Sequence, residues 1–156
     1  MLSARPYSRG ELVRKLVDKG EDRDMAELVA DWLEELKYLD DVAYAAEVVR
    51  HYSGKGYGLA RVKNELYRHR VPRELWDDAL DEFPDMGDAI DELLRRRLRG
   101  VMPDRAELRK SGDYLRRRGF DWDDIKSALT RYVESVEYEE TDDEYDEEEY
   151  EAEDEE

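Results

Sequence analysis

The side chains of this sequence that could do chemistry are few. The only histidines are His51 and His69, and each stands near the end of an expected helix among polar neighbours. Either could act as a base or a metal ligand, but a surface position at a helix C-terminus also explains them, because the helix dipole favours a cation there. The chain has no cysteine, which excludes thiolate chemistry and disulfides.

Two pairs of adjacent acids, Asp40-Asp41 and Asp123-Asp124, raise the alternative of a metal or acid–base site. Adjacent residues of a helix point in different directions, however, and both pairs stand where a helix N-terminus needs a cap. The glycine-rich run 54–58 lacks the strand before it and the Gly-Lys-Ser/Thr ending of a phosphate-binding loop. We therefore expect no catalysis, no metal and no cofactor.

Helices are the elements that must position these residues, since no segment alternates like a strand. Ser8 and Glu11 have the spacing of a capping box, and the segment 24–27 repeats it at the expected start of a second helix. Asp40 is suited to cap a third helix. The last expected helix is capped within 121–124 and fades after Val133.

Aromatic residues on the apolar faces have two interpretations. Trp32, Trp76 and Trp122 all fall on such faces. We interpret them as core anchors, with base stacking as the alternative.

Similar helical segments recur along the chain. Residues 71–80 and 120–129 have the same length and the same apolar positions, and Leu16, Leu66 and Leu115 each precede a helix end by four residues. A short helical unit cannot bury its apolar face alone, so such units stack on their neighbours. Stacked units usually provide binding surfaces rather than catalytic pockets. The sequence therefore predicts an all-α protein with a binding function.

Charge is strongly segregated. Residues 139–156 hold 14 of the 44 acidic residues and no basic one, so the other 30 acids face 26 basic residues, a net charge of −4. Residues 95–118 carry ten basic side chains against Asp104, Glu107 and Asp113, a local charge of +7. This basic segment comprises Arg95, Arg96, Arg97, Arg99, Arg105, Arg109, Lys110, Arg116, Arg117 and Arg118. It predicts contact with DNA phosphate or with an acidic partner surface, beyond the dipole complementation that explains some of its members.

The acidic segment 139–156 is expected to be a disordered tail, because like charges repel and apolar residues do not recur in it. It would serve either as a solubilising extension or as an intramolecular competitor of DNA. The chain has no long apolar run, so we expect a cytoplasmic protein without a membrane span. A monomer is expected because the repeats need no symmetric partner to close their core.

The order of these features resembles the RecX family of bacterial recombinase regulators, over about residues 6–132. The residues that carry the resemblance are Tyr7 to Leu12, Leu16, Lys19-Gly20, Leu39, Asp40, Asp41, Tyr44, Ala45, Gly58, Arg61-Val62, Glu65, Leu66, Leu115, Arg118, Gly119, Phe120 and Ile125. The chain departs from the pattern at His69-Arg70-Val71, where the family tends to have Lys-Gly-Ile. The acidic tail is also outside the pattern.

The resemblance implies tandem three-helix repeats in an elongated, curved array, occupying residues 1–138, with repeats at about 6–52, 53–100 and 101–138. It implies binding in the groove of the RecA recombinase filament and modulation, mostly inhibition, of ATPase and strand exchange in DNA repair and the SOS response. Within this reading, Leu39, Asp40, Asp41, Tyr44, Ala45, Gly58, Leu66 and Gly119 are structural.

Two other functions remain open. The first is a stand-alone DNA-binding module of helix-turn-helix-like units, although the expected recognition helices, 73–82 and 121–131, are more acidic than basic. The second is an adaptor that does not contact nucleic acid.

Overall fold

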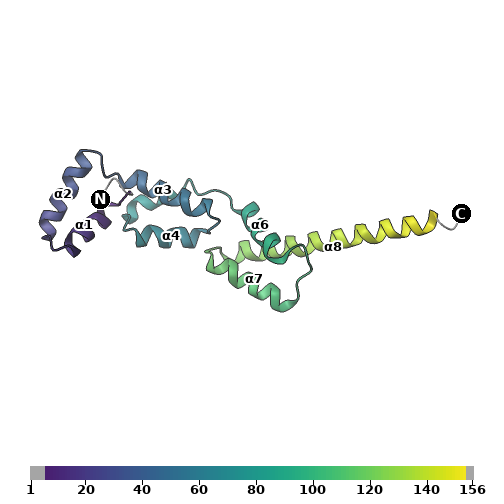
Figure 1. The fold of residues 1–156 in the computed structure, drawn as a ribbon. Coiled ribbons are helices and arrows are strands. Elements are labelled where there is room, and N and C mark those ends of the chain that lie inside the picture. Colours follow the sequence, from purple (N-terminus) through teal and green to yellow (C-terminus); the bar gives the residue numbers. More distant parts are fainter. Residues whose placement is uncertain (1–5, 154–156) are drawn as a thin grey trace. The chain divides into compact units, whose positions relative to one another are not determined.

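The computed structural model describes the backbone of residues 6–153 and the side chains of residues 6–140. Within this part of the chain every regular element is helical, which confirms the predicted all-α class (Figure 1). The elements are α1 (Arg9–Asp18), α2 (Arg23–Glu35), α3 (Asp41–Gly54), α4 (Leu59–Arg68), the 3₁₀ helix η1 (Arg73–Leu75), α5 (Trp76–Leu80), α6 (Gly87–Leu98), α7 (Arg105–Arg117) and α8 (Trp122–Glu153). A search of the described helices found none with the length and apolar character of a membrane span.

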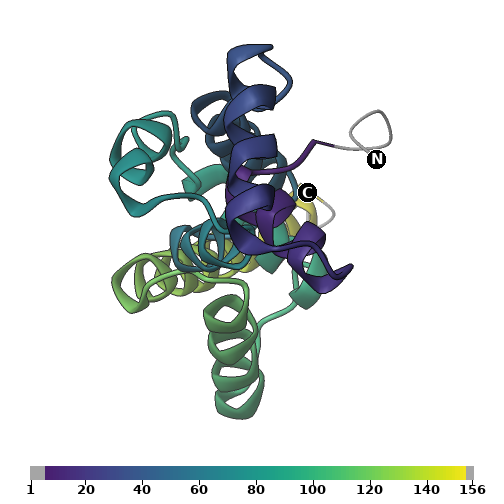
Figure 2. The same ribbon diagram turned by 90° about the vertical axis from the view of Figure 1, so that its left-hand side faces the viewer.

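The chain divides into two compact units, residues 1–84 and 85–156. In unit 1, α1 packs on α2, and the two helices lie side by side in Figure 1 and in the turned view of Figure 2. Leu12, Val13 and Leu39 are buried in this core. A second core in this unit lies where α3 packs on α4, η1 and α5. In unit 2, α8 packs on both α6 and α7, and Leu94 and Leu115 are fully buried.

The packing groups the helices differently from the expected repeats, whose boundaries lie near 52/53 and 100/101. Helix α3 extends across the first of these positions and packs on α4 and α5, which follow it. Helix α6 ends before the second position but packs on α8, which lies beyond it. Apolar spacing shows which face of a helix is buried, but it does not show which neighbour covers that face.

Most of the predicted helix starts are present. The Ser8 hydroxyl accepts a hydrogen bond from the Glu11 N–H at 3.1 Å, and the capping box is complete. Asp40, Asp104 and Asp121 each accept a hydrogen bond from the backbone N–H three residues later. The start of α2 differs, because its N-cap is Asp22 rather than Asp24 and no side-chain cap bond forms there.

The tryptophans correct one prediction. Trp76 is a core anchor, since it is buried and its indole N–H donates to the Val71 carbonyl at 3.0 Å. Trp32 and Trp122 are not, because 59% and 52% of their surfaces are exposed. The part of α2 that is buried against α1 centres on Ala26 and Ala30, so Trp32 remains outside the contact.

The C-terminal segment also corrects a prediction. Contrary to the sequence prediction, helix α8 does not fade after Val133 but continues as helix through Glu153. The disorder expected for the acidic tail stays a prediction, and residues 154–156 of that tail lie outside the described residues. Tyr132 and Val136 are buried against the rest of unit 2, so the helix is already nucleated when it enters the acidic run. Extending an existing helix requires no new nucleus, and glutamate has a high helix propensity, which together offset the repulsion between like charges.

Several helix ends use the left-handed backbone conformation. Gly20, Gly56 and Gly119 adopt positive φ at the ends of α1, α3 and α7. Lys37, Arg70 and Arg99 adopt φ of 62°, 57° and 58° at the ends of α2, α4 and α6, where a side chain costs about 1–2 kcal/mol. Arg70 therefore ends α4 without the glycine that the family tends to have there.

Candidate partner interface

The basic segment spans the end of α6 and the whole of α7. Arg95 and Arg96 are exposed, and both pair with Glu92, at 2.7 Å and 3.0 Å. Helix α7 presents five basic side chains against two acidic ones. Surface ion pairs of this kind contribute little to stability, so the Glu92 pairs do not account for the concentration of charge.

Two members of the segment meet on an aromatic ring. The Arg97 guanidinium carbon lies 4.8 Å from the centre of the Tyr114 ring, and that of Arg118 lies 5.7 Å from it. Arg97 also donates to the Ser111 hydroxyl at 3.3 Å. Cation–π contact and the hydrogen bond hold Arg97 in place, so this side chain also has a structural role.

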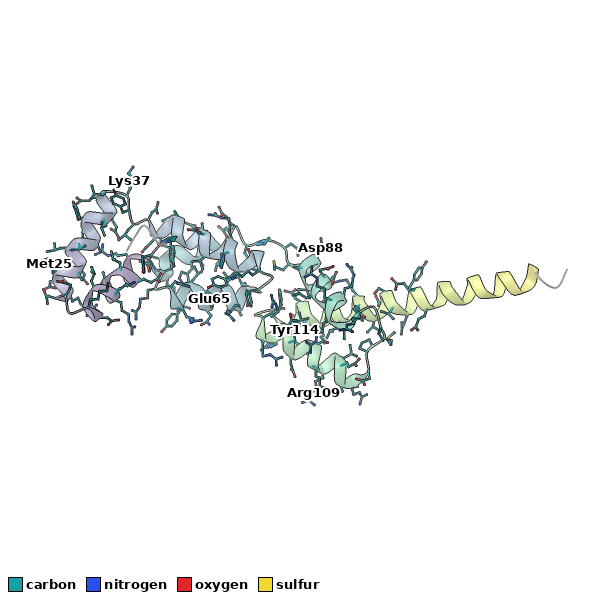
Figure 3. The ribbon with its side chains drawn as sticks, in the orientation of Figure 1. Met25, Lys37, Glu65, Asp88, Arg109 and Tyr114 are labelled. Carbon is teal, nitrogen blue, oxygen red and sulfur yellow. The ribbon has the colours of Figure 1, made fainter. Side chains whose placement is uncertain are left out.

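The exposed side of α7 carries a row of cations. Arg105, Arg109 and Arg116 are exposed and follow one another at helical spacings of four and seven residues. They span about 17 Å at the rise of an α-helix. Figure 3 shows Arg109 on the outer side of α7 and Tyr114 on the side toward α6 and α8. A second row, Lys110 and Arg117, is exposed as well.

The sequence reasoning missed two side chains of this region. Arg131 of α8 lines a depression of about 620 Å³ together with Arg95 and Arg99, and it pairs with Asp91 at 2.9 Å. Tyr114 was also missed, although its spacing of four from Arg118 on one helix would have indicated their contact. The position of Arg131 had no local signal, because its partners lie on a helix some 40 residues away in the chain.

The residues interpreted as structural occupy core and capping positions. Leu39, Ala45 and Leu66 are buried. Gly58 is the N-cap of α4, Gly119 adopts a φ of 97° after α7, and Asp40 caps α3. Asp41 accepts a hydrogen bond from the Arg9 N–H at 2.8 Å and thereby joins α3 to α1. Burial raises the pKa of the Asp41 carboxyl, against the effect of the Arg9 N–H.

His69 lies in a polar network with residues of α1, α3 and α4. Its Nδ1 is 3.1 Å from the Tyr44 hydroxyl and 3.4 Å from a Glu11 oxygen, and its Nε2 is 3.4 Å from Glu65. His51 is exposed and packs edge-on against Tyr52. No group of three or more metal-ligating side chains was found among the described residues.

Glu65 is the centre of that network and is 2% exposed. It accepts from Arg61 at 3.0 Å and from Arg68 at 3.3 Å. Burial by itself raises the pKa of the Glu65 carboxyl, but a hydrogen bond from Tyr52 and the charges of the two arginines outweigh it, so the pKa lies below its ordinary value. The ionised form is thus favoured in the folded protein.

Replacing Glu65 with glutamine is expected to destabilise unit 1 by about 2 kcal/mol at neutral pH, since bonds to a charged acceptor are lost. A carboxyl whose folded pKa is lowered stabilises the fold above its unfolded pKa, and this contribution disappears as the pH falls through the folded pKa. The difference in unfolding free energy between wild type and Glu65→Gln should therefore have its full value above about pH 5 and become smaller below about pH 4. Urea unfolding at several pH values measures it.

A matched control is Glu82→Gln, because Glu82 is exposed and pairs with Arg50 at 3.5 Å. This variant should differ little from wild type at any pH. A Glu65→Gln difference that stays constant from pH 3 to pH 7 would contradict the role assigned to the ionised carboxyl.

The sequence matches two family profiles. Residues 40–80 match "RecX, second three-helix domain", and residues 85–129 match "RecX, third three-helix domain". The first range covers α3, α4, η1 and α5, and the second covers α6, α7 and the packed start of α8. The matched ranges therefore agree with the helix groups that the packing defines.

Curated relatives and solved structures agree with these profiles. "Regulatory protein RecX" of Xanthomonas axonopodis pv. citri is 38% identical over 134 residues, which are 85% of this chain and 82% of the relative. Its namesake in Stenotrophomonas maltophilia (strain R551-3) matches with the same identity and coverage. The crystal structure of RecX from Lactobacillus salivarius has the same fold, with a TM-score of 0.73 at 21% identity over 84% of this chain and 88% of that one. The chain belongs to the RecX family.

Proposed function

We propose that this protein regulates the RecA recombinase by binding the RecA–DNA filament in its groove, and that it lowers ATPase and strand-exchange activity there. Family membership supports the regulatory role. The observation that carries the proposal is the row of exposed arginines on α7, which suits a filament that contains DNA. The effect would be stoichiometric, by a monomer that performs no reaction of its own.

A stand-alone DNA-binding module is the second candidate, since the same row would suit free DNA. The helices in the recognition position do not favour it. Helix α5 has only five residues, and two of them are Asp77 and Asp78. The first turn of α8 contains Asp123 and Asp124. A recognition helix needs donors at this end to read base edges, so these helices do not suit base readout, and any contact with free DNA would come from the cations of α6 and α7 on phosphate.

The test is a titration of RecA ATPase on single-stranded DNA, with direct binding of the protein to the same DNA measured in parallel without RecA. Under the proposal, ATPase falls at protein concentrations well below those that coat the DNA. A decrease that tracks DNA coverage would instead identify a competing DNA binder. No effect on ATPase and no DNA binding would leave an adaptor role and contradict the proposal.

A further inference from the structure

We propose that unit 1 carries a second phosphate-binding surface, formed by α1 and the end of α4 and centred on Arg70, which contacts the phosphodiester backbone of a single nucleic-acid strand. Its residues lie outside the basic segment of α6 and α7. It therefore adds a separate nucleic-acid contact to the function proposed above.

Arg70 has an unusual backbone conformation for its residue type. Its φ of 57° is a conformation that L side chains rarely adopt, whereas the positive-φ residue at the ends of α1, α3 and α7 is a glycine. The end of α4 is closed by backbone bonds from the Val71 N–H to the Leu66 carbonyl and from the Arg70 N–H to the Tyr67 carbonyl, both at 3.0 Å. The Ser8 hydroxyl also donates to the His69 carbonyl there, and none of these bonds uses the Arg70 side chain. Glycine could form both bonds without strain, so capping does not explain an arginine.

The Arg70 side chain is positioned by packing, but its charge is not neutralised by a carboxylate among the described residues. A Cβ on Gly10 would lie 2.8 Å from the Arg70 Cβ and 3.6 Å from its Cδ, so the stem of Arg70 runs against the start of α1. The residue is nevertheless exposed. Among the described residues, no carboxylate forms an ion pair with Arg70. Its guanidinium is therefore available for a partner.

Other cations line the same depression as Arg70. Arg70, Arg68, Arg14 and Lys15 line one depression of about 320 Å³. The acids on its rim are Glu11 and Asp18. Glu11 is already engaged with the Ser8 N–H at 3.3 Å and with His69 at 3.4 Å, and Asp18 has only an exposed pair with Arg14 at 3.6 Å.

An extended polyanion fits this arrangement better than a small ligand does. Arg14, Arg68 and Arg70 are all exposed, so the cations are spread over a surface rather than enclosed in a cavity. Guanidinium groups bind phosphate oxygens in pairs, and successive phosphates of one strand can engage successive arginines. The phosphodiester backbone is the partner whose charge repeats in this way.

The experiment compares Arg70→Gly with Lys37→Gly in the full chain. Both changes replace a cation of positive φ with glycine. Lys37, labelled in Figure 3 at the end of α2, follows Glu34 and Glu35 in the sequence. Affinity for a 30-nucleotide oligo(dT) is measured by fluorescence anisotropy between 50 and 300 mM salt, together with the urea midpoint of each variant.

Arg70→Gly should fold at least as stably as wild type, because the strained conformation is relieved. It should bind oligo(dT) about fivefold more weakly at 0.1 M salt, with a salt slope lower by about 0.7, the effect of one lost phosphate contact. Lys37→Gly should leave affinity and slope unchanged, and Arg70→Lys should retain most of the binding.

Wild-type affinity and slope in Arg70→Gly would overturn the proposal. An equal loss in Lys37→Gly would do so as well, since the effect would then come from net charge alone. These measurements contain no RecA, so their failure is separate from a failure of the filament role, which the ATPase titration tests.

Discussion

Replacing Arg95 and Arg96 with glutamate is expected to weaken binding to RecA–DNA filaments by about 25-fold at 0.1 M salt and to lower the salt slope by about 1.4, if each arginine contacts one phosphate. Both side chains are largely exposed, with fractions of 70% and 76%, and they share one exposed partner, Glu92. Their replacement should change the free energy of unfolding by no more than about 0.5 kcal/mol. A loss of binding would therefore report contact and not unfolding.

Arg97 is kept in this variant because it supports the fold through Tyr114 and Ser111. The control reverses two other exposed cations, Lys63 on α4 and Lys126 on α8. Binding is measured on the filament and on free single-stranded DNA. If only binding to the filament is weakened, the two arginines contact a RecA surface. If binding to the filament and binding to free DNA are both weakened, they contact phosphate. Equal binding by the wild type and the double variant across the salt titration would contradict a role for this end of α6.

Ser8→Ala is expected to cause a large loss of stability in unit 1. The Ser8 side chain is fully buried, accepts from the Glu11 N–H and donates to the His69 carbonyl, 61 residues away. Alanine would remove the N-cap, worth about 1 kcal/mol, and would leave a partly buried carbonyl without its donor, worth at least about 1 kcal/mol more. Unit 1 should lose about 2 kcal/mol, which lowers its melting temperature by about 10 °C.

Circular dichroism melting of the full chain measures this change. Ser53→Ala is the matched control, because Ser53 lies near the end of α3 and donates only to the Arg50 carbonyl of its own helix, at 3.3 Å. That variant should melt within about 2 °C of wild type. If the melting temperature of Ser8→Ala equals that of Ser53→Ala, the bond from Ser8 to His69 does not join α1 to α4 in the way the structure indicates.

The sequence by itself determined the local structure and the family. The capping residues Ser8 and Asp40, and a cap within 121–124, were identified from the local sequence, because a cap bonds to a backbone group only three residues away. The all-α class followed from apolar periodicity. Membership of the RecX family followed from the order of motifs and is confirmed by the relatives. The basic segment was identified from composition alone, since charged residues can be counted without knowing the fold.

Only the tertiary structure decided which residues meet. Trp76 is covered while Trp32 is exposed, although both lie on apolar faces, because coverage depends on which helix packs there. The contacts of Ser8 with His69 and of Gly10 with Arg70 join segments about 60 residues apart, and no local pattern encodes them. The continuation of α8 past Val133, where apolar spacing predicts that the helix fades, accompanies the burial of Val136 in unit 2. Interactions three or four residues apart follow from helix geometry, whereas contacts between helices depend on the competition among all the apolar faces of the chain.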